Sequence, residues 1–382
     1  MQRPWYQLDN EKDVASPGLL IYKDRVLENI RRMLAMIGGD VSRLRPHIKT
    51  HKLSEIVALH IEHGITRFKC ATIAEAEMLA SAGAADILLA YQPVGPNIER
   101  LLLLMQKAPE AAFSVIVDNE RSIRELSESV CAADRGRPSG AASPKLTLDT
   151  FLDIDSGMHR TGVLPGRHAV ELYHLIAHSP GLRAAGLHAY DGHINASDPA
   201  VRAEACEAAF APVLALRTEL RNQGLPAPRI IAGGTPTYPF HARRDSEVDC
   251  SPGTCVLWDY GYSSRLADLD FLHAALVLTR VVSKPAGDRL CLDLGHKAIA
   301  SENPHPRVHL PEIPDAKFVT HSEEHLVVET QHAARFELGS VLYGIPWHVC
   351  PTVALHSEAV VVTGRHGEQQ WNIAARARRL TI

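Results

Sequence analysis

Two hydrophobic patterns divide the chain. From Pro17 to about Asp259, short apolar runs alternate with longer stretches in which apolar residues recur every three or four positions. The short runs are typical of buried strands and the longer ones of amphipathic helices. Strands that alternate with helices pair in parallel through right-handed crossovers. About eight such units in roughly 250 residues are the size of a (β/α)8 barrel, which we therefore predict.

The predicted barrel has eight expected strands with helices between them. The expected strands are residues 19–22, 44–49, 67–72, 86–91, 113–118, 146–155, 184–190 and 229–232. The expected helices include residues 54–63, 74–82, 98–105 and 200–221. A doubly wound open sheet is the alternative α/β architecture, but no Gly-x-Gly-x-x-Gly follows the first strand.

After about Leu266 the helical periodicity disappears. Strand-like runs follow at residues 274–282, 289–294, 326–330 and 359–362, and turn residues crowd 304–314. This pattern predicts a β-rich domain. We expect a barrel at residues 16–265 and a β-rich domain at 266–382, with residues 1–15 packing on the latter. A cluster of Gly, Pro and Ser between 136 and 144 predicts a loop inside the barrel.

Composition excludes several classes of protein. Of 382 residues, 46% are hydrophobic and 22% charged, which indicates a packed core. A net charge of −4 gives no argument for nucleic acid or an anionic membrane as a partner. No window reaches the roughly 20 apolar residues of a membrane span, and the first ten residues do not resemble a signal peptide. Seven scattered cysteines favour reduced thiols, so we expect a cytoplasmic protein.

Lys49 is the strongest candidate for chemistry. It ends a short apolar strand in the sequence Arg-Pro-His-Ile-Lys-Thr-His-Lys, which begins at Arg45 and includes His47. A lysine amine condenses with an aldehyde once its surroundings depress its pKa, and the nearby cations Arg45 and Lys52 act in that direction. A basic surface turn is the alternative interpretation of the same segment.

Two further strand ends carry polar groups. The segment from Asp153 to Gly162 places Arg160 where it can meet an anion or a ring heteroatom, although a surface arginine in a turn has the same pattern. The segment from Leu187 to His193 supplies His188, Tyr190 and His193 as candidate acid–base groups, and a buried core histidine is the alternative for His188. Residues at strand ends line the catalytic face of a barrel.

Two glycine-containing turns are candidate phosphate cups. Gly233, Gly234 and Thr235 follow the strand at 229–232, and Gly253 and Thr254 belong to a second turn. Glycines allow the backbone N–H groups to approach an anion closely, and threonine hydroxyls add donors. In barrels the loops after the last strands often hold a phosphate.

His348 and Cys350 are the candidate metal ligands. On a strand, residues two apart share a face, so an imidazole nitrogen and a thiolate would point the same way. This pair suits Zn²⁺, and two protein ligands leave positions open for water or a substrate oxygen. A chance pairing in a β-rich domain is the alternative.

Taken together, these motifs resemble the family of D-threonine aldolases and eukaryotic-type D-serine dehydratases. The resemblance also includes Asp293-x-Gly295-x-Lys297, Ser322-Glu323-Glu324-His325 and Pro346-x-His348-x-Cys350, and it covers nearly the whole chain in order. This family belongs to the alanine racemase-like, fold type III enzymes that use pyridoxal 5′-phosphate (PLP). It implies an alanine racemase-type barrel, a C-terminal β-rich domain and a homodimer.

The resemblance also implies roles for residues. Lys49 matches the lysine that forms the Schiff base with PLP, and the candidates at the strand ends and glycine turns match cofactor-binding positions. Those positions are His47, Arg160, His188, Tyr190, Gly233, Gly234, Thr235, Gly253 and Thr254. His348 and Cys350 match the ligands of a divalent metal, either Zn²⁺, Mn²⁺ or Mg²⁺. Aldolases of the family often have His where this chain has Asp191, so His193 becomes the candidate base.

The implied substrate is a small D-β-hydroxy amino acid. Retro-aldol cleavage to glycine and an aldehyde is the expected reaction. Dehydration of D-serine or D-threo-3-hydroxyaspartate to a 2-oxo acid and ammonia is the alternative, because both reactions use the same groups. An amino acid racemase, which has no use for the metal, and a non-catalytic PLP-binding protein are the remaining readings.

Overall fold

The chain divides into two compact units. The computed structural model describes residues 3–136 and 145–382, so most of the predicted loop at 136–144 lies outside the described residues. One unit, called the barrel unit here, contains residues 34–49, 57–253 and 377–382. The other, called the sheet unit, contains residues 1–33, 50–56 and 254–376. The predicted domain boundary at residue 265 stays a prediction.

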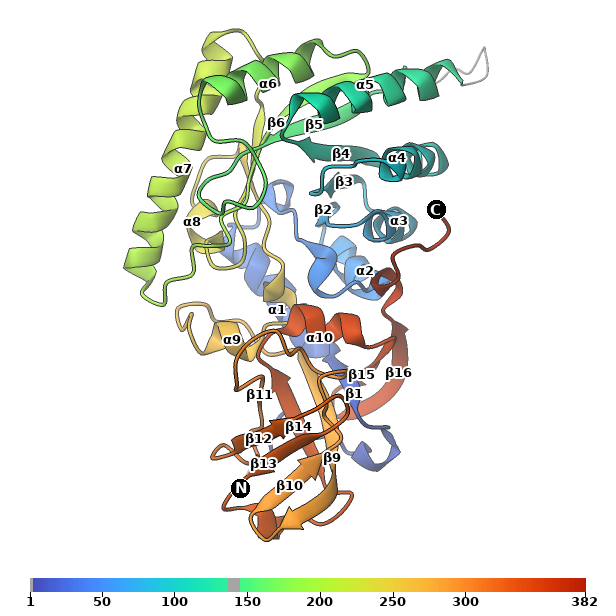
Figure 1. Ribbon diagram of the computed structural model, residues 1–382, viewed down its shortest axis with the longest axis vertical. Helices are drawn as coiled ribbons and strands as arrows, with labels where there is room; N and C mark the ends of the chain where they lie inside the picture. The colour runs from blue at the N-terminus through green and yellow to red at the C-terminus, as the bar shows by residue number, and fades with distance from the viewer. Residues whose placement is uncertain (1–2, 137–144) are drawn as a thin grey trace. The chain divides into compact units, whose positions relative to one another are not determined.

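Seven parallel strands form a curled sheet in the barrel unit (Figure 1), and they neighbour one another in sequence order. They are β2 (Arg67–Cys70), β3 (Asp86–Leu89), β4 (Ala112–Val117), β5 (Leu148–Asp153), β6 (Leu182–Ala189), β7 (Arg229–Ala232) and β8 (Val248–Cys250). Sequential parallel order is what repeated right-handed crossovers produce.

Residues 44–47 link the two edges of this sheet. Leu44 forms a parallel bridge with Cys250 of β8, and His47 forms one with Lys69 of β2. The Lys69 N–H donates to the carbonyl of Pro46 at 2.9 Å. The segment thus occupies the place of an eighth strand, which confirms the predicted barrel. It is shorter than predicted, because Lys49 lies in a 3-10 turn, η3 (Ile48–Thr50).

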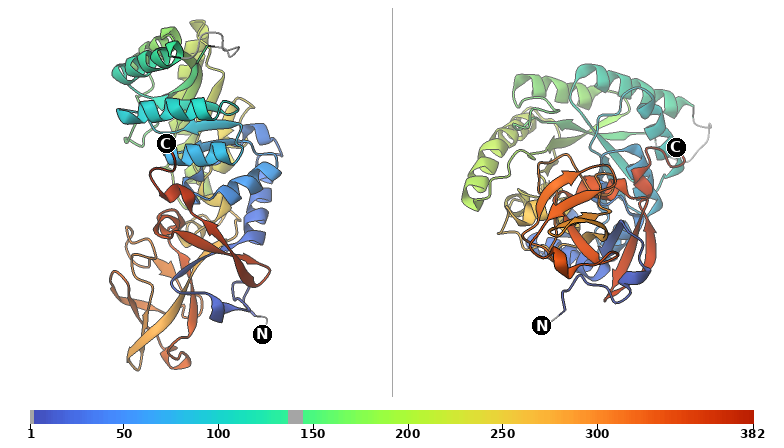
Figure 2. Two further views of the ribbon diagram at one scale, coloured as in Figure 1. Left: turned by 90° about the vertical axis from the view of Figure 1, so that its right-hand side faces the viewer. Right: turned by 60° about the horizontal axis from the view of Figure 1, so that its bottom comes forward.

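Helices cover the outside of the curled sheet (Figure 1 and Figure 2). They are α2 (Ser54–Glu62), α3 (Ile73–Ser81), α4 (Pro96–Lys107), α5 (Glu120–Arg135), α6 (Arg167–His178), α7 (Pro199–Asn222) and α8 (Tyr238–His241). Caps fix where several begin: the Thr72 hydroxyl accepts from the N–H of Glu75 at the start of α3. All four predicted helices are present, with small changes at their ends.

A mixed sheet forms the core of the sheet unit. Its strands are β1 (Gly18–Tyr22), β9 (Ala275–Ala286), β10 (Arg289–Leu292), β11 (Val308–His309), β12 (Lys317–His321), β13 (Leu326–Glu329), β14 (Val341–Pro346), β15 (Glu358–Thr363) and β16 (His366–Asn372). The long strand β9 pairs antiparallel with β1, β10 and β14. The predicted β-rich character is confirmed.

The predicted strand at 19–22 belongs to this sheet and not to the barrel. β1 pairs with β15 and β9, with Leu20 opposite both Val360 and Leu276. Leu20 and Tyr22 pack into a core with Leu276, which explains why the segment is apolar. The expectation that it opens the barrel was therefore wrong, because an apolar strand does not show in its sequence which sheet it will join.

Candidate active site

A cavity of about 550 Å³ opens in the barrel unit where several strands end. It is lined by groups that follow β2, β3, β4, β5 and β6, as expected where the carboxyl ends of parallel strands converge. The structure brings five predicted site residues together in this lining: His47, Lys49, Arg160, His188 and Tyr190. Lys69 and Asp153 line the same cavity.

The ring of Tyr190 organises the cations of the cavity. The Lys49 amine lies 5.6 Å from its centroid, and the Arg160 guanidinium carbon lies 5.0 Å from it. A cation over an aromatic face is attracted by the ring quadrupole. The Lys49 amine and the Arg160 guanidinium therefore both lie close to the ring of Tyr190.

A buried row of polar groups lies beside them. The Asp153 carboxylate is 2.6 Å from His188 Nδ1, and His188 Nε2 is 3.3 Å from the Lys69 amine. Burial lowers the pKa of His188 below its ordinary value, and the charge of Lys69 lowers it further, while Asp153 opposes this. Burial, followed by the charge of Lys49, lowers the pKa of Lys69 to about 7.

Lys69 was missed in the sequence because it belongs to no motif. The only signal is a lysine in the interior of a strand that is otherwise buried, since Phe68, Lys69 and Cys70 are all buried. Lysine is almost never fully buried without a reason.

The predicted glycine turns meet at the ends of β7 and β8. Gly233 has φ +73°, and a Cβ on it would lie 2.6 Å from Cδ2 of His241. The Gly253 N–H donates to the Thr235 hydroxyl at 3.2 Å. Nearby in sequence, the Ser251 hydroxyl is buried and has no hydrogen-bond partner among the described residues. Thr254 begins η4 (Thr254–Val256), which the structure assigns to the sheet unit.

Asp191 supports the first glycine turn. Its carboxylate accepts from the Thr237 hydroxyl at 2.7 Å and from His241 Nε2 at 2.8 Å. The Thr237 oxygen in turn accepts from the Gly234 N–H at 3.2 Å. The residue that replaces the usual histidine of the aldolases is thus a buried structural acceptor.

Asp191, Cys206 and His241 lie close enough to be considered as metal ligands. The hydrogen bonds argue against this. Arg244 donates to His241 Nδ1 at 3.2 Å, so in the neutral ring the proton is on Nε2, the atom nearest the other two groups. Burial also raises the pKa of the Cys206 thiol to about 12, which disfavours the thiolate that a metal requires.

His193 lies apart from the cavity lining. Its side chain is exposed, and a Cβ on Gly157 would lie 2.9 Å from its Nε2. Its role as a base stays a prediction.

His348 and Cys350 are neighbours in the sheet unit, but they do not lie on a strand. His348 caps the helix α10 (Val349–Leu355), so the argument from strand faces was wrong. Cys350 Sγ lies 3.3 Å from the Thr50 hydroxyl, and His348 Nδ1 lies 2.5 Å from a Glu302 oxygen.

The two side chains also affect one another electrostatically. Burial opposes the charged form of His348, but its hydrogen bond to Cys350 raises the pKa of the imidazole to about 9. Burial raises the pKa of the Cys350 thiol, and His348 more than offsets this, so the pKa falls below its usual value. The pair favours a thiolate, the form that ligates metals, beside an imidazolium that must release its proton before its nitrogen can bind an ion.

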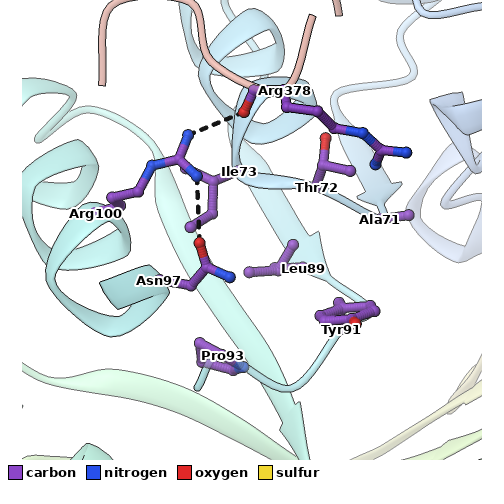
Figure 3. Close-up of a pocket in the computed structure, with 9 residues that line it drawn as sticks. All are labelled: Ala71, Thr72, Ile73, Leu89, Tyr91, Pro93, Asn97, Arg100 and Arg378. Carbon is purple, nitrogen blue, oxygen red and sulfur yellow. Dashed lines mark hydrogen bonds between the residues drawn. The ribbon is translucent and has the colours of Figure 1, made fainter. Parts of the chain in front are cut away.

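A second pocket adjoins the cavity and shares Ala71 and Tyr91 with it (Figure 3). Its Arg100 points toward the last residues of the chain. The Arg100 guanidinium donates to the main-chain oxygens of Arg378 at 3.1 Å and Ile382 at 2.8 Å. This pocket therefore anchors residues 377–382 on the barrel unit.

A parallel barrel with lysines in its cavity, joined to a β-rich unit, has the architecture of the alanine racemase class. The model of "Alanine racemase, N-terminal domain" matches residues 21–259, and that of "Putative serine dehydratase domain" matches residues 274–362. The chain belongs to the alanine racemase-like family that contains the D-threonine aldolases.

Characterised relatives match over nearly their whole length. The D-threonine aldolase of Arthrobacter sp. is 32% identical over 95% of this chain and 93% of its own. The 3-hydroxy-D-aspartate aldolase of Paracoccus denitrificans (strain Pd 1222) is 28% identical over 97% of this chain and 94% of its own. The crystal structure of D-threonine aldolase from Filomicrobium marinum has a TM-score of 0.87 at 28% identity, covering 97% of this chain and 98% of that one.

Within the described residues, no helix is both long and apolar enough to cross a membrane.

Proposed function

We propose that this protein is a PLP- and divalent metal-dependent lyase that cleaves D-β-hydroxy amino acids into glycine and an aldehyde. The observation that carries the proposal is the position of Lys49 in the cavity, against Tyr190, in a chain that matches D-threonine aldolase from end to end. A homodimer in the cytoplasm is part of the proposal, and the seven free cysteines are consistent with a reducing compartment.

The described residues fit PLP. Lys49 supplies an amine inside the cavity, and the ring of Tyr190 supplies a flat surface. Near the ends of β7 and β8, the Ser251 hydroxyl is buried without a hydrogen-bond partner among the described residues, which suits a phosphate oxygen. When bound, PLP withdraws electrons from the substrate Cα.

Residues of the chain then have distinct tasks. We assign Lys49 to hold the cofactor and to exchange a proton at Cα, and Arg160 to orient an anionic or ring group. His47, His188 and Tyr190 shape the cavity, whereas Gly233, Gly234, Thr235, Gly253 and Thr254 belong to the phosphate turns. His193 is the proposed base.

His348 and Cys350 fit a divalent ion, because their donor set combines a nitrogen and a sulfur with thiolate character. An ion held there by these two ligands would act as a Lewis acid and would lower the pKa of a substrate hydroxyl group bound to it. Activity assays with Zn²⁺, Mn²⁺ and Mg²⁺ added separately would show which of these ions the protein uses.

The test is a product assay with D-threonine and D-serine in the presence of PLP and Mn²⁺ or Zn²⁺. Glycine with acetaldehyde from D-threonine is the expected result, with loss of activity in EDTA. Full activity in a metal-stripped sample would instead support a racemase. Bound PLP without turnover of any D-β-hydroxy amino acid would support a non-catalytic protein.

A D-serine or hydroxyaspartate dehydratase is the second candidate. The match of the serine dehydratase domain to residues 274–362 specifically favours it. Its signature in the same assay is a 2-oxo acid with ammonia and no aldehyde.

A further inference from the structure

Lys69 is a second amine in the cavity for which the proposed function has no task. Its side chain is 2% exposed, yet it lines the cavity together with Lys49. It also lies 5.7 Å from the centroid of the Tyr190 ring, close to the 5.6 Å of Lys49. The two amines therefore flank the same aromatic surface.

The hydrogen bond of Lys69 differs from that of an ordinary buried lysine. Buried ammonium groups are normally paired with a carboxylate. Here the group at hydrogen-bond distance is His188 Nε2, and the Asp153 carboxylate lies behind the imidazole, at Nδ1. Because Asp153 accepts from Nδ1–H, the neutral ring presents a lone pair at Nε2. His188 thus accepts an N–H of Lys69 and orients its amine without neutralising a charge.

The charges around Lys69 come from several elements. Burial is the largest influence and lowers its pKa, and Lys49 and Arg45 lower it further, while Asp153 and Asp191 raise it. The cavity lining also contains His47, on the segment bridged to β2, and Arg160. Its other titratable groups are Asp118, Tyr91, His188 and Tyr190. The balance leaves a pKa of about 7, so a large fraction of Lys69 is a neutral amine at physiological pH.

We propose that Lys69 is a catalytic base that removes a proton from the ammonium group of the incoming amino acid, with His188 and Asp153 as positioning residues. This inference rests on the proposed function, because it requires a substrate amine that displaces Lys49 from an aldehyde.

The proposed step is a simple proton transfer. An amino acid arrives as an ammonium ion, which has no lone pair with which to attack the carbon that holds the Lys49 nitrogen. One N–H bond of the substrate breaks, its electron pair stays on the substrate nitrogen, and the proton forms a new N–H bond on Lys69. The neutral substrate amine then takes the place of the Lys49 amine. Once released, Lys49 is the amine to which Lys69 returns the proton, so no other reactant is needed.

The first test uses the cofactor-free protein and does not depend on activity. Competitive labelling with acetic anhydride across a pH series, followed by peptide mass spectrometry, reports the pKa of each amine. Lys69 is expected to be half-reactive near pH 7, well below the roughly 10.4 of a lysine amine in a model peptide, and the exposed Lys107 at the end of α4 serves as the reference amine in the same peptide map. Half-reactivity of Lys69 above pH 9, or no labelling at any pH, would overturn the inference.

The second test isolates amine exchange from cleavage. D-Alanine has an amine but no β-hydroxyl, so mixing it with the PLP-loaded protein in a stopped-flow instrument follows exchange alone through cofactor absorbance. Lys69→Met is expected to slow exchange at pH 8 by about 100-fold, in the range of general-base catalysis. Lys69→Arg keeps the charge but cannot lose a proton, so it should be equally slow. The matched control Lys107→Met should exchange at the wild-type rate.

The outcomes separate this inference from the proposed function. In the wild type, the exchange rate should show a break near pH 7, where Lys69 becomes protonated. Lys69→Met should lack this break, and its rate should follow only the fraction of D-alanine whose amine is neutral. Rescue by Lys69→Arg would show that only the charge matters, and the inference would fail. Absence of aldehyde from D-threonine, with Lys69-dependent exchange of D-alanine intact, would overturn the proposed aldol cleavage and leave the role of Lys69 standing.

Discussion

At the scale of single residues, two lysines lie beside one tyrosine ring, and we propose that one amine holds the cofactor and that the other accepts a proton. Lys49 and Lys69 lie at nearly the same distance from Tyr190, but only Lys49 belongs to a recognisable motif. The sequence, through strand ends that converge in a barrel and through its family resemblance, predicted that His47, Lys49, Arg160, His188 and Tyr190 lie in one place. It could not reveal Lys69, because a hydrogen bond from a lysine to a histidine 119 residues away has no local signature.

Lys49→Ala is expected to abolish the visible absorbance of the Schiff base with PLP, since no other amine is proposed to make that bond. Absorbance spectra of the purified variant after addition of PLP, followed by borohydride reduction and peptide mapping, provide the measurement. Lys107→Ala is the matched control and should keep the band. A retained band in Lys49→Ala, mapped to Lys52 or Lys69, would contradict the assignment.

His348→Ala should spare PLP binding and remove metal-dependent turnover, because the imidazole supplies one of two proposed metal ligands. Cofactor absorbance and bound metal by mass spectrometry are measured alongside aldehyde release. His356→Ala, whose ring contacts the carbonyl of Ala298 and belongs to no proposed site, is the control. Undiminished metal content and turnover in His348→Ala would refute the ligand assignment.

At the scale of elements, the glycine turn after β7 depends on a buried carboxylate. Asp191→Ala removes the acceptor of both Thr237 and His241, whose polar groups would remain buried. The expected loss of unfolding free energy is about 1–3 kcal/mol, with weaker PLP affinity because Gly234 is positioned through Thr237. Chemical denaturation and PLP titration measure the two effects. Asp198→Ala, at the exposed cap of α7, should leave PLP affinity unchanged.

Residues 377–382 are held on the barrel unit by hydrogen bonds from the Arg100 side chain. Arg100→Ala removes the donors to Arg378 and Ile382, so we expect faster amide exchange in residues 377–382 and a stability loss of about 1–2 kcal/mol. Hydrogen exchange with mass spectrometry measures this. Arg121→Ala, which breaks an exposed pair with Glu125, should change neither property measurably. Equal protection of the tail in both variants would count against the anchor.

Elements also show why part of the fold was mispredicted. β1 is short and largely apolar, as the barrel strands β3 and β7 are, and only the register with β9 and β15 assigns β1 to the other sheet. His348 and Cys350 were placed on a strand because residues two apart on a strand share a face, which requires the apolar run before them to continue past Ile345. The run instead ends at Pro346, and α10 begins with Pro351 in its first turn, a position that proline tolerates.

At the scale of the whole molecule, one buried acid makes stability depend on pH. Burial raises the pKa of Glu312 from 4.5 to about 7, and the charge of Glu11 adds to this, although hydrogen bonds from the backbone and Tyr6 oppose it. The folded protein therefore keeps a proton that the unfolded chain releases near pH 4.5, so this residue reduces stability as pH rises from 4.5 to about 7.

Glu312→Gln should remove that dependence. Its melting temperature is expected to match the wild type at pH 5 and to exceed it at pH 8, as measured by differential scanning calorimetry. The control is Glu204→Gln at an exposed position of α7, whose difference in melting temperature from the wild type should be the same at pH 5 and at pH 8. A gain in the melting temperature of Glu312→Gln that is larger at pH 5 than at pH 8 would contradict the predicted direction of the pH dependence.

The interleaving of the two units determines when each can be completed during synthesis. β1 emerges from the ribosome long before its partners, since β9 begins at Ala275 and β15 at Glu358. The barrel unit likewise waits for Thr381, which donates its N–H to Glu77. The apolar strand β1 must remain without its complete sheet until β15 has been made, which exposes it to aggregation. Neither unit can therefore fold completely during synthesis before the other. We expect the need for chaperones to be greatest in the interval before β15 has been synthesised.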